Sequence, residues 1–464
     1  MTDNDLPEEC FEEHRGWKLS ILGIIQWLSE QIPIRTLFET DAMYYYENGI
    51  YKAHGDKKIE ERLEAQFGSL THNGKLVLEG CGKILKKIRH RTYIASTEFD
   101  NDKDIVNMKN GLYNWRTGEF KPHTPDYPCL IQIPVNYDPE ADCPNIKKSF
   151  DAVFYEKDLE KFLEFIAYCL YNGYPIQKAF LLYSPGENGK SFVMNIVRQF
   201  LGPDNCAEVG LQQFGSNRFT TADLYGKLMN SCGDLDATAM KKTGDFKKII
   251  SGYDPIRAEE KGKDDFRFIN RAKMIFGTNI IPNVPDTTDG FFRRLEVLLT
   301  TKMQKGDKER LHLPNDAQVL TPEEMSGLFN WVIPKLAPLI KRGKFTKQMD
   351  LVETREMYKT ASDPISMFIE NELEETPQCK IDKKEVYNRF LKYCKEHNVF
   401  LDIKNQEFWR QAHKLVPDMK TDGGWINVEG KKKHVQCLYN YKWASIDDVE
   451  FTNDGAKPHK YKYL

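Results

Sequence analysis

The chain has 464 residues, of which 40% are hydrophobic and 29% charged, and its formal net charge is −3. This composition is typical of a soluble globular protein, and no stretch of about 18 uncharged apolar residues indicates a membrane span. The net charge provides no general attraction to nucleic acid, so any such contact must come from local basic features. Because a single core seldom exceeds roughly 250–300 residues, we expect two to four domains, most simply three.

The cysteines and the first residues bear on the compartment. Ten cysteines are scattered singly, and no two approach the Cys-x2-Cys spacing of a zinc site, so we expect reduced thiols. Met1 to Cys10 is acidic and polar and lacks the basic and apolar layout of a secretory signal. We therefore expect a cytoplasmic protein.

Two hairpins are predicted in the first 150 residues. Met43 to Tyr51 carries Asn48-Gly49 between β-prone runs, the strongest short signal for a type I′ turn, and a second hairpin is expected over Leu112 to Phe120. A basic cluster, explained equally well as an exposed helix face or as a DNA-facing surface, comprises Lys83, Lys86, Lys87, Arg89 and Arg91.

A phosphate-binding loop is predicted near the middle of the chain. The apolar strand Ala179 to Tyr183 precedes the loop, and helical spacing follows it as far as Gly202. This strand-loop-helix order lets backbone N–H groups converge on a triphosphate. The candidate nucleotide-binding residues are Pro185, Gly186, Glu187, Asn188, Gly189, Lys190 and Ser191. A helix-capping turn is the alternative.

Two residues of this loop have specific expected roles, and one position departs from the usual pattern. Lys190 would neutralise the β- and γ-phosphates of ATP, and Ser191 would place its hydroxyl on Mg²⁺. The first glycine of the usual eight-residue pattern is replaced by Ser184. Pro185 and Gly186 must therefore form the tight entry to the loop.

Catalytic partners of the loop are expected downstream. The segment 227–236 suits a strand ending in carboxylates, where Asp234 is favoured over Asp236 to hold Mg²⁺ or polarise the attacking water. Taken alone, these acids could equally form an ordinary acidic turn. A buried strand over 272–279 delivers Asn279, whose amide could orient that water, because ligands sit beyond the carboxyl ends of parallel strands.

Charged residues beyond these strands indicate contacts with a neighbouring subunit and with DNA. Arg293 and Arg294 could act as an arginine finger in trans, the alternative being a solvated surface. Ile256 to Phe268 is typical of a β-hairpin, and Lys261 and Lys263 flank its tip. In a ring, such hairpins would line a channel with positive charge, although a plain surface hairpin explains them too.

The last third of the chain is predicted to be helical and then basic. Thr321-Pro322-Glu323-Glu324 announces a helix, and two amphipathic helices, 382–398 and 405–416, precede a hairpin over 423–439. From Gln378 to Trp443 there are 14 Lys and Arg against 8 Asp and Glu. Helices followed by a basic hairpin indicate a winged helix, with a packing module as the alternative.

In a winged helix, the second amphipathic helix would enter the major groove, and the hairpin would contact phosphates. The residues expected to face the bases are Gln406, Arg410, Gln411 and Lys414. The lysines expected on the wing are Lys431, Lys432 and Lys433.

The motifs taken together resemble one family. Gly-Glu-Asn-Gly-Lys-Ser, Gly-Asp-Leu, Gly-Tyr-Asp-Pro-Ile-Arg-Ala-Glu, Phe-Gly-Thr-Asn and Thr-Asp-Gly-Phe-Phe-Arg-Arg follow one another in this order. The order resembles the poxvirus, phage and plasmid primase-helicase branch of superfamily 3, most densely between Phe180 and Thr300 and more weakly over 40–440. The resemblance implies an AAA+-related P-loop ATPase, a hexamer that translocates on single-stranded DNA, usually 3′ to 5′.

The expected fold class is α/β, an AAA+-related P-loop ATPase core with an α+β N-terminal region and a C-terminal winged-helix-like domain. The expected domains are an N-terminal collar (1–150), the ATPase (151–305), a helical lid or linker (306–365), the winged-helix-like domain (366–445) and a tail (446–464). Relatives often carry primase acids that hold two metals. The nearest candidate here, Asp100-Asn101-Asp102, lies in a polar run that reads as a loop.

The sequence thus predicts an ATP-dependent replicative DNA helicase or replication initiator of a virus, plasmid or mobile element. We expect ATP and Mg²⁺ as cofactors and single-stranded or forked DNA as partner, with origin duplex as a further candidate. A viral protein would act in the host cytosol. The alternatives are an ATP-switched origin-binding protein that does not unwind DNA, and a primase-helicase with cryptic primase activity.

Overall fold

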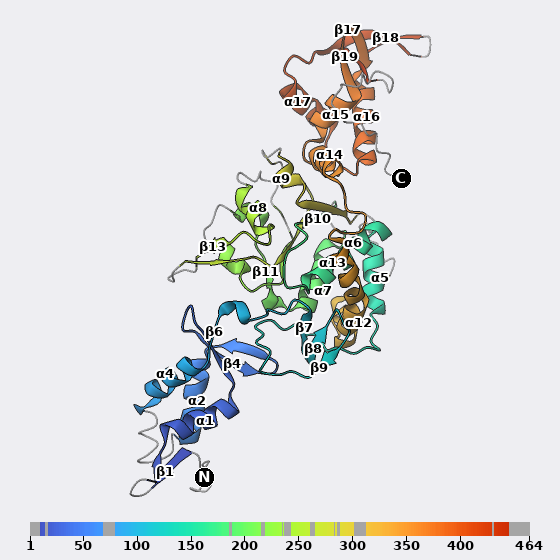
Figure 1. Ribbon diagram of the computed structural model, residues 1–464. Helices are drawn as coiled ribbons and strands as arrows, with labels where there is room; N and C mark the ends of the chain where they lie inside the picture. Colours follow the sequence, from blue (N-terminus) through green and yellow to red (C-terminus); the bar gives the residue numbers. More distant parts are fainter. Residues whose placement is uncertain are drawn as a thin grey trace.

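The computed structural model describes residues 10–13, 17–67, 79–184, 188–214, 219–233, 235, 243–259, 265–282, 284, 288–300, 312–428 and 431–444. The N-terminal elements lie at one end of an elongated molecule, a parallel sheet lies in the middle and the C-terminal elements lie at the other end (Figure 1). Across the described residues, no helix is both long and apolar enough to cross a membrane. All ten cysteines are free thiols.

The N-terminal region combines helices with a four-stranded sheet of order β5-β4-β3-β6. Its apolar core includes Ile24, Leu28, Ile59 and Ile88, which come from three different helices. The elements are β1 (Phe11–Glu13), β2 (Trp17–Leu19), α1 (Ile21–Gln31), β3 (Ile34–Leu37), β4 (Met43–Glu47), β5 (Ile50–Ala53), α2 (Gly55–Phe67), α4 (Cys81–Arg91), β6 (Tyr93–Ile94) and η3 (Ser96–Glu98).

Both predicted N-terminal hairpins are confirmed. β4 and β5 pair antiparallel around Asn48 and Gly49, whose φ angles of 54° and 84° are both positive, as a type I′ turn requires. β7 (Ile105–Met108), β8 (Gly111–Asn114) and β9 (Phe120–Lys121) form a second antiparallel sheet. This sheet leads into α5 (Pro144–Val153) and α6 (Glu156–Cys169).

A five-stranded parallel sheet of order β11-β12-β15-β10-β16 forms the centre of the molecule. Its strands are β10 (Ala179–Tyr183), β11 (Cys206–Ala207), β12 (Met229–Cys232), β15 (Lys273–Thr278) and β16 (Leu295–Leu299). Every residue of β10 and β15 is buried, as expected for central strands of a parallel sheet that is covered on both faces. The predicted strands at 179–183 and 272–279 are confirmed.

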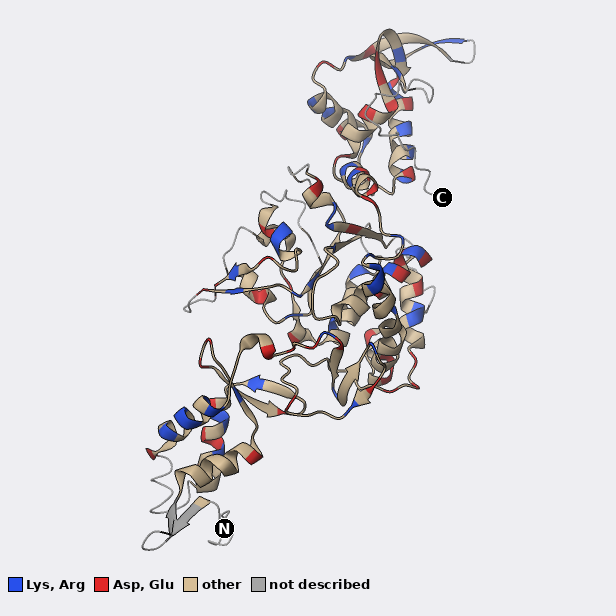
Figure 2. Cartoon of the chain, viewed as in Figure 1, with Lys and Arg blue, Asp and Glu red and all other residues tan. Residues whose placement is uncertain are grey.

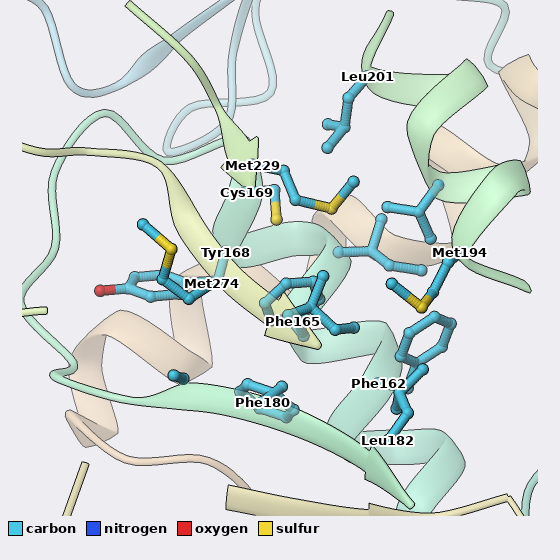
Figure 3. Packing of buried hydrophobic residues seen from close by; sticks show 14 of the residues in the cluster. Phe162, Phe165, Tyr168, Cys169, Phe180, Leu182, Met194, Leu201, Met229 and Met274 are labelled. Atoms are coloured by element: carbon cyan, nitrogen blue, oxygen red, sulfur yellow. The ribbon is translucent and has the colours of Figure 1, made fainter. Parts of the chain in front are cut away.

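Helices cover this sheet and bury its apolar side chains. Figure 3 shows Phe162 and Phe165 of α6, Phe180 of β10, Met194 of α7 (Lys190–Leu201) and Met274 of β15 in one cluster. Burying each such side chain stabilises the fold by about 1.5–3 kcal/mol. The other elements of this part are η4 (Pro203–Asn205), η5 (Leu211–Gln213), η6 (Thr220–Leu224), α8 (Gly244–Ile249), β13 (Ile256–Ala258), β14 (Phe266–Phe268) and α9 (Asp289–Phe292).

The predicted helix at Thr321 is confirmed, because the Thr321 hydroxyl accepts a hydrogen bond from the Glu324 backbone N–H at the start of α12 (Pro322–Val332). Within α12, Gly327 lies directly against the backbone of Asp142 and Cys143. The neighbouring helical elements are α11 (Asp316–Val319), η7 (Ile333–Lys335), α13 (Leu336–Arg342) and α14 (Leu351–Ser362).

The C-terminal region has its own apolar core, which includes Phe368, Phe390, Phe408 and Leu438. Its elements are α15 (Pro364–Glu372), β17 (Leu373–Asp382), α16 (Lys383–Glu396), α17 (Asn405–Leu415), β18 (Thr421–Val428) and β19 (Lys431–Trp443). The strands form an antiparallel sheet of order β17-β19-β18. Both predicted amphipathic helices are confirmed within two residues, and the predicted hairpin is confirmed with a second strand that continues four residues further, to Trp443.

We predict that Gly327→Ala destabilises the protein by about 1–3 kcal/mol, because a Cβ at this position would lie 2.2 Å from the Asp142 carbonyl carbon. Thermal denaturation would measure the change. Gly82→Ala in α4 is the matched control, since a Cβ there meets nothing within 4 Å and alanine favours a helix by about 0.5–1 kcal/mol. Equal melting temperatures for the two variants would contradict the prediction.

Candidate functional site

Three neighbouring strands end at one edge of the parallel sheet. Tyr183, the last residue of β10, is in register with Thr278 of β15 and with Leu299 of β16. The polar residues that follow these strands are Ser184, Asn279 and Thr300. Because parallel strands place their carboxyl ends together, three segments far apart in the sequence supply polar groups to one place.

The helix α7 begins at this edge. Its N-cap is Gly189, with φ 79° and ψ 3°, a left-handed conformation that glycine adopts without steric cost. Lys190 is the first residue of α7 and is buried, whereas Ser191 in the same turn is exposed. Asn188 is buried, and the loop residues Pro185, Gly186 and Glu187 lie outside the described residues.

The Lys190 ammonium joins the ends of the strands. Its Nζ donates hydrogen bonds to Asn279 Oδ1 at 2.7 Å and to the hydroxyl and carbonyl oxygens of Ser184 at 2.8 and 3.0 Å. Thr300 Oγ1 and Ser184 Oγ are 2.7 Å apart. The structure therefore brings together the predicted Lys190 and Asn279, and it adds Ser184 and Thr300.

Sequence reasoning missed the roles of Ser184 and Thr300. Ser184 was treated only as a replacement for a glycine, yet its fully buried hydroxyl contacts both Lys190 and Thr300. The one available signal was a hydroxyl residue directly after the apolar strand β10. Thr300 follows β16 in the same way, but strand order was needed to show that the two residues meet.

The predicted acids Asp234 and Asp236 lie outside the described residues. The flanking residues Gly233 and Leu235 pack against the end of β15. The Leu235 N–H donates to the Gly277 carbonyl at 3.0 Å, and a Cβ on Gly277 would lie 2.6 Å from the Gly233 carbonyl oxygen. This close approach requires glycine at position 277.

The paired arginines have different environments. Arg293 is exposed, whereas Arg294 is 6% exposed and its Nη1 donates to the Gly290 carbonyl at 2.6 Å. Burial lowers the pKa of the Arg294 guanidinium from its ordinary value, and the charge of Arg293 lowers it further. Only Arg293 therefore presents its guanidinium to solvent.

The helix α14 holds the element that carries these arginines. The Tyr358 ring lies 5.7 Å from the rings of both Phe291 and Phe292, and its hydroxyl donates to the Pro282 carbonyl at 2.6 Å. Arg355 forms an ion pair with Asp289 at the start of α9. The position of Arg293 thus depends on a helix outside the sheet.

A cluster of buried charged side chains is centred on Glu296 of β16. Glu296 is fully buried, and its carboxylate contacts Lys161 Nζ at 2.9 Å and Lys178 Nζ at 3.5 Å. Burial lowers the pKa of Lys178, and the carboxylate of Glu296 opposes that shift. Because removal of one partner would leave a buried charge unpaired, the cluster fixes β16 relative to α6 and β10.

The predicted hairpin at 256–268 is confirmed in its stem. Ile256–Ala258 pairs antiparallel with Phe266–Phe268, and the Tyr225 ring packs against Phe266 and Phe268 at 5.2 and 5.4 Å. The tip residues Lys261 and Lys263 lie outside the described residues.

Asp100, the nearest candidate for a primase acid, is a structural carboxylate. It is 7% exposed, its Oδ1 accepts from the Leu130 and Ile131 N–H groups at 3.0 and 3.3 Å, and its Oδ2 pairs with Arg271 at 3.2 Å. Asp102 caps its own loop by accepting from the Asp104 N–H at 2.9 Å. Within the described residues, no group of three or more His, Cys, Asp or Glu is arranged to hold a metal.

Most of the predicted basic residues outside the central sheet are exposed, but Arg89 of α4 is half-buried and its Nη2 lies 3.9 Å from Met43 Sδ. Basic residues lie along α4 and on the outer part of the β18–β19 hairpin (Figure 2). Gln406, Arg410, Gln411 and Lys414 are all exposed on α17, although Arg410 is paired with Glu407 at 2.7 Å. The wing lysines Lys431, Lys432 and Lys433 are also exposed.

Three family models match the chain. The model described as D5 N terminal like matches residues 17–155, and the model described as Poxvirus D5 protein-like matches residues 360–450. Between them, a family of unknown function, DUF5906, matches residues 182–294. The D5-type matches confirm the resemblance to the primase-helicase family on both sides of the parallel sheet.

Known proteins add two further likenesses. A protein of Acanthamoeba polyphaga mimivirus with a provisional helicase name is 24% identical over 213 residues, which are 43% of this chain and 22% of that protein. The apo structure of the NrS-1 C terminal region has a TM-score of 0.44 and 11% identity, and the alignment covers 92% of this chain and all of that chain. A second apo structure of that region, residues 305–718, has a TM-score of 0.43 and 10% identity, and its alignment covers 90% of this chain and 99% of that chain.

The amino end of β15, opposite the polar edge, carries a buried lysine. Lys273 is 1% exposed, its Nζ donates to the Tyr171 carbonyl, and it lies 4.8 Å from the centre of the Tyr168 ring. Burial lowers the pKa of Lys273 to about 7. Between that value and the unfolded pKa of 10.5, the unfolded chain binds a proton that the folded chain does not, so the free energy of unfolding rises with pH.

We predict that Lys273→Met raises the melting temperature most near pH 7 and that this advantage shrinks toward pH 10, where the unfolded chain loses the same proton. Melting temperatures at pH 7, 8.5 and 10 would measure the trend. Lys341→Met, at an exposed position of α13, should show no such trend. A constant difference between Lys273→Met and the parent protein at all three values would contradict the assignment.

Proposed function

We propose, from the premise that D5-type primase-helicase-like regions flank its parallel sheet, that this chain is an ATP-dependent replicative DNA helicase or replication initiator. It would serve a virus, plasmid or other mobile element. The observation that carries the proposal is the hydrogen bond of 2.7 Å from Lys190 Nζ, at the start of α7, to Asn279 Oδ1. A lysine at a helix N-terminus next to a strand-end amide suits an ATPase better than a plain binding surface.

The residues at this edge fit ATP and Mg²⁺. The first turn of α7 offers backbone N–H groups and the positive end of the helix dipole to an anion, and Lys190 adds a full charge. The exposed Ser191 hydroxyl and the carboxylate of Asp234 would hold Mg²⁺, a metal that prefers oxygen ligands. Mg²⁺ would supply charge neutralisation on the phosphates.

The structure supports separate roles for the side chains in hydrolysis. Ser184 and Thr300 would hold the Lys190 ammonium where the phosphates bind. Asn279, now occupied by Lys190, would orient the attacking water once the lysine turns to the nucleotide, while Asp234, or alternatively Asp236, polarises that water. Because nucleotide binding would break the hydrogen bond between Lys190 and Asn279, nucleotide binding and water positioning would be linked.

Assembly into a ring would complete the site. The exposed Arg293 is suited to reach a neighbouring subunit, whereas the buried Arg294 is suited to hold α9 through Gly290. The proposed partner is single-stranded or forked DNA, bound by a hexamer whose channel is lined by Lys261 and Lys263. The C-terminal region would add a winged-helix-like DNA contact through the exposed basic residues Arg410, Lys414, Lys431, Lys432 and Lys433.

The domains are proposed as an N-terminal collar over 1–150, an AAA+-related P-loop ATPase of superfamily 3 over 151–305, a helical lid over 306–365 and a winged-helix-like domain over 366–445, followed by a tail. An ATP-switched origin-binding protein is the main alternative, and the presence of Asn279 beside Lys190 favours hydrolysis over it. Primase activity is disfavoured because Asp100 is engaged by Arg271 and two backbone N–H groups. Synthesis of labelled primers by the protein on a single-stranded template would demonstrate primase activity.

We predict that Lys190→Ala abolishes DNA-stimulated ATP hydrolysis, because it removes the positive charge that lies at the start of α7 next to Asn279. Phosphate release with single-stranded DNA would measure the loss, and circular dichroism would check that the variant is folded. The exposed lysine variant Lys341→Ala should hydrolyse ATP at the parent rate. ATP hydrolysis at the parent rate by folded Lys190→Ala would contradict the proposal.

We predict that catalysis requires Arg293 from a neighbouring subunit. Lys190→Ala and Arg293→Ala should each be inactive alone, but a 1:1 mixture should complete about a quarter of the sites in mixed rings. Hydrolysis measured across mixing ratios would reveal this rescue. No recovery at any ratio, under conditions where subunits exchange, would exclude catalysis in trans by Arg293.

A further inference from the structure

An exposed tryptophan lies on the C-terminal hairpin. Trp425 of β18 is 63% exposed, whereas Trp27, Trp115 and Trp409 are each at most 6% exposed. The indole is large and apolar, so leaving it in water forgoes substantial burial energy. Among the tryptophans whose exposure is described, Trp425 is exposed and the others are buried or half-buried.

The register of the hairpin shows what shares a face with Trp425. Trp425 pairs directly with His434, and the next residues on the same face are Asn427 and its partner Lys432. The His434 and Trp425 rings lie 5.3 Å apart with an interplanar angle of 64°. His434, Asn427 and Lys432 are all exposed, so the face combines aromatic rings, an amide and a positive charge.

This face continues onto the helix α17. Thr421, four residues before Trp425 and therefore on the same face, has its Oγ1 3.1 Å from His413 Nε2 of α17. The residue after His413 is the exposed Lys414. The exposed strip on this face therefore consists of Trp425, His434, Asn427 and Lys432, whereas Thr421 and His413 at its inner end are half-buried.

The chemistry of the strip points to a nucleic acid. Lys432 is exposed on this face at the outer end of the hairpin, and Lys431 and Lys433 are exposed on the opposite face of the same strand. A cation beside aromatic rings, with further cations at the same end of the hairpin, fits a polymer with a regular anionic backbone and flat bases. A purely apolar partner would leave the Lys432 ammonium group on this face without compensation.

The aromatic faces select single strands over duplex. In a duplex, both faces of each base are covered by neighbouring bases, and reaching them costs a few kcal/mol of unstacking per step. Unpaired bases offer their faces freely, and stacking on an aromatic side chain tolerates any base. Trp425 would therefore contribute most where the strands have already separated.

We propose that Trp425, with His434 and Lys432, forms a stacking site for unpaired bases of single-stranded DNA on the C-terminal hairpin. The inference rests on the proposed function and deepens it, because it gives this region a single strand as ligand instead of an origin duplex. The hairpin would hold a strand outside the channel of the ring.

The test uses the full chain without nucleotide. Anisotropy titrations would compare a labelled 20-nucleotide thymidine strand with a blunt 20-base-pair duplex. Trp425→Ala should weaken single-strand binding roughly tenfold and duplex binding by less than about twofold. Trp425→Phe should retain part of the affinity because it keeps a ring, whereas Trp425→Leu should behave like Trp425→Ala. Tyr155→Ala, which removes another exposed ring, should bind normally.

Photocrosslinking supplies an independent measurement. A strand carrying 5-iodouracil should crosslink to the peptide that contains Trp425, as mass spectrometry would show. Unchanged single-strand affinity in Trp425→Ala, or an equal loss on duplex, would overturn the stacking site. If the parent protein hydrolyses ATP while Trp425→Ala binds normally, this inference alone fails. If single-strand binding depends on Trp425 but the protein hydrolyses no ATP, the proposed helicase function fails and the stacking site stands.

Discussion

The order of strands in the parallel sheet is the constraint on which the candidate site depends. β10 lies between β15 and β16, so the polar residues after three separate strands arrive at the start of α7. Lys190 can then reach Asn279, 89 residues later in the chain, at 2.7 Å. If β15 were not beside β10, Asn279 would not reach Lys190, and if β16 were not beside β10, Thr300 would not reach Ser184.

The C-terminal region contacts the sheet next to this site, and the N-terminal region contacts the opposite edge of the sheet. The Phe400 N–H donates to the Tyr183 hydroxyl at 3.2 Å, and the two rings lie 5.2 Å apart, so the C-terminal region contacts the residue just before Ser184. On the N-terminal side, Asp100 pairs with Arg271, two residues before β15. Both ends of the elongated molecule are thus joined to strands that carry site residues.

Buried charge illustrates how function and stability are separated in this chain. Glu296 and Lys161 form an ion pair that is buried from solvent and fixes β16 against α6. Lys190 is also buried, but it is hydrogen-bonded to groups at the edge of the sheet. The loop motif identifies Lys190 in the sequence, but Glu296 and Lys161 are each a charged residue beside an apolar run, and their role is not apparent from the sequence. Only the position relative to the strand ends separates a structural ion pair from a candidate catalytic group.

The sequence by itself determined the local elements: the strand and helix around the loop, the Asn48-Gly49 turn, the helix capped by Thr321 and the basic C-terminal hairpin. These follow from short-range spacing, turn chemistry and capping, which act within a few residues. The tertiary structure decided that Ser184 and Thr300 join Lys190, that Arg293 is exposed while Arg294 is buried, and that Asp100 is an anchor. These outcomes depend on long-range strand order and burial, which local sequence patterns do not encode.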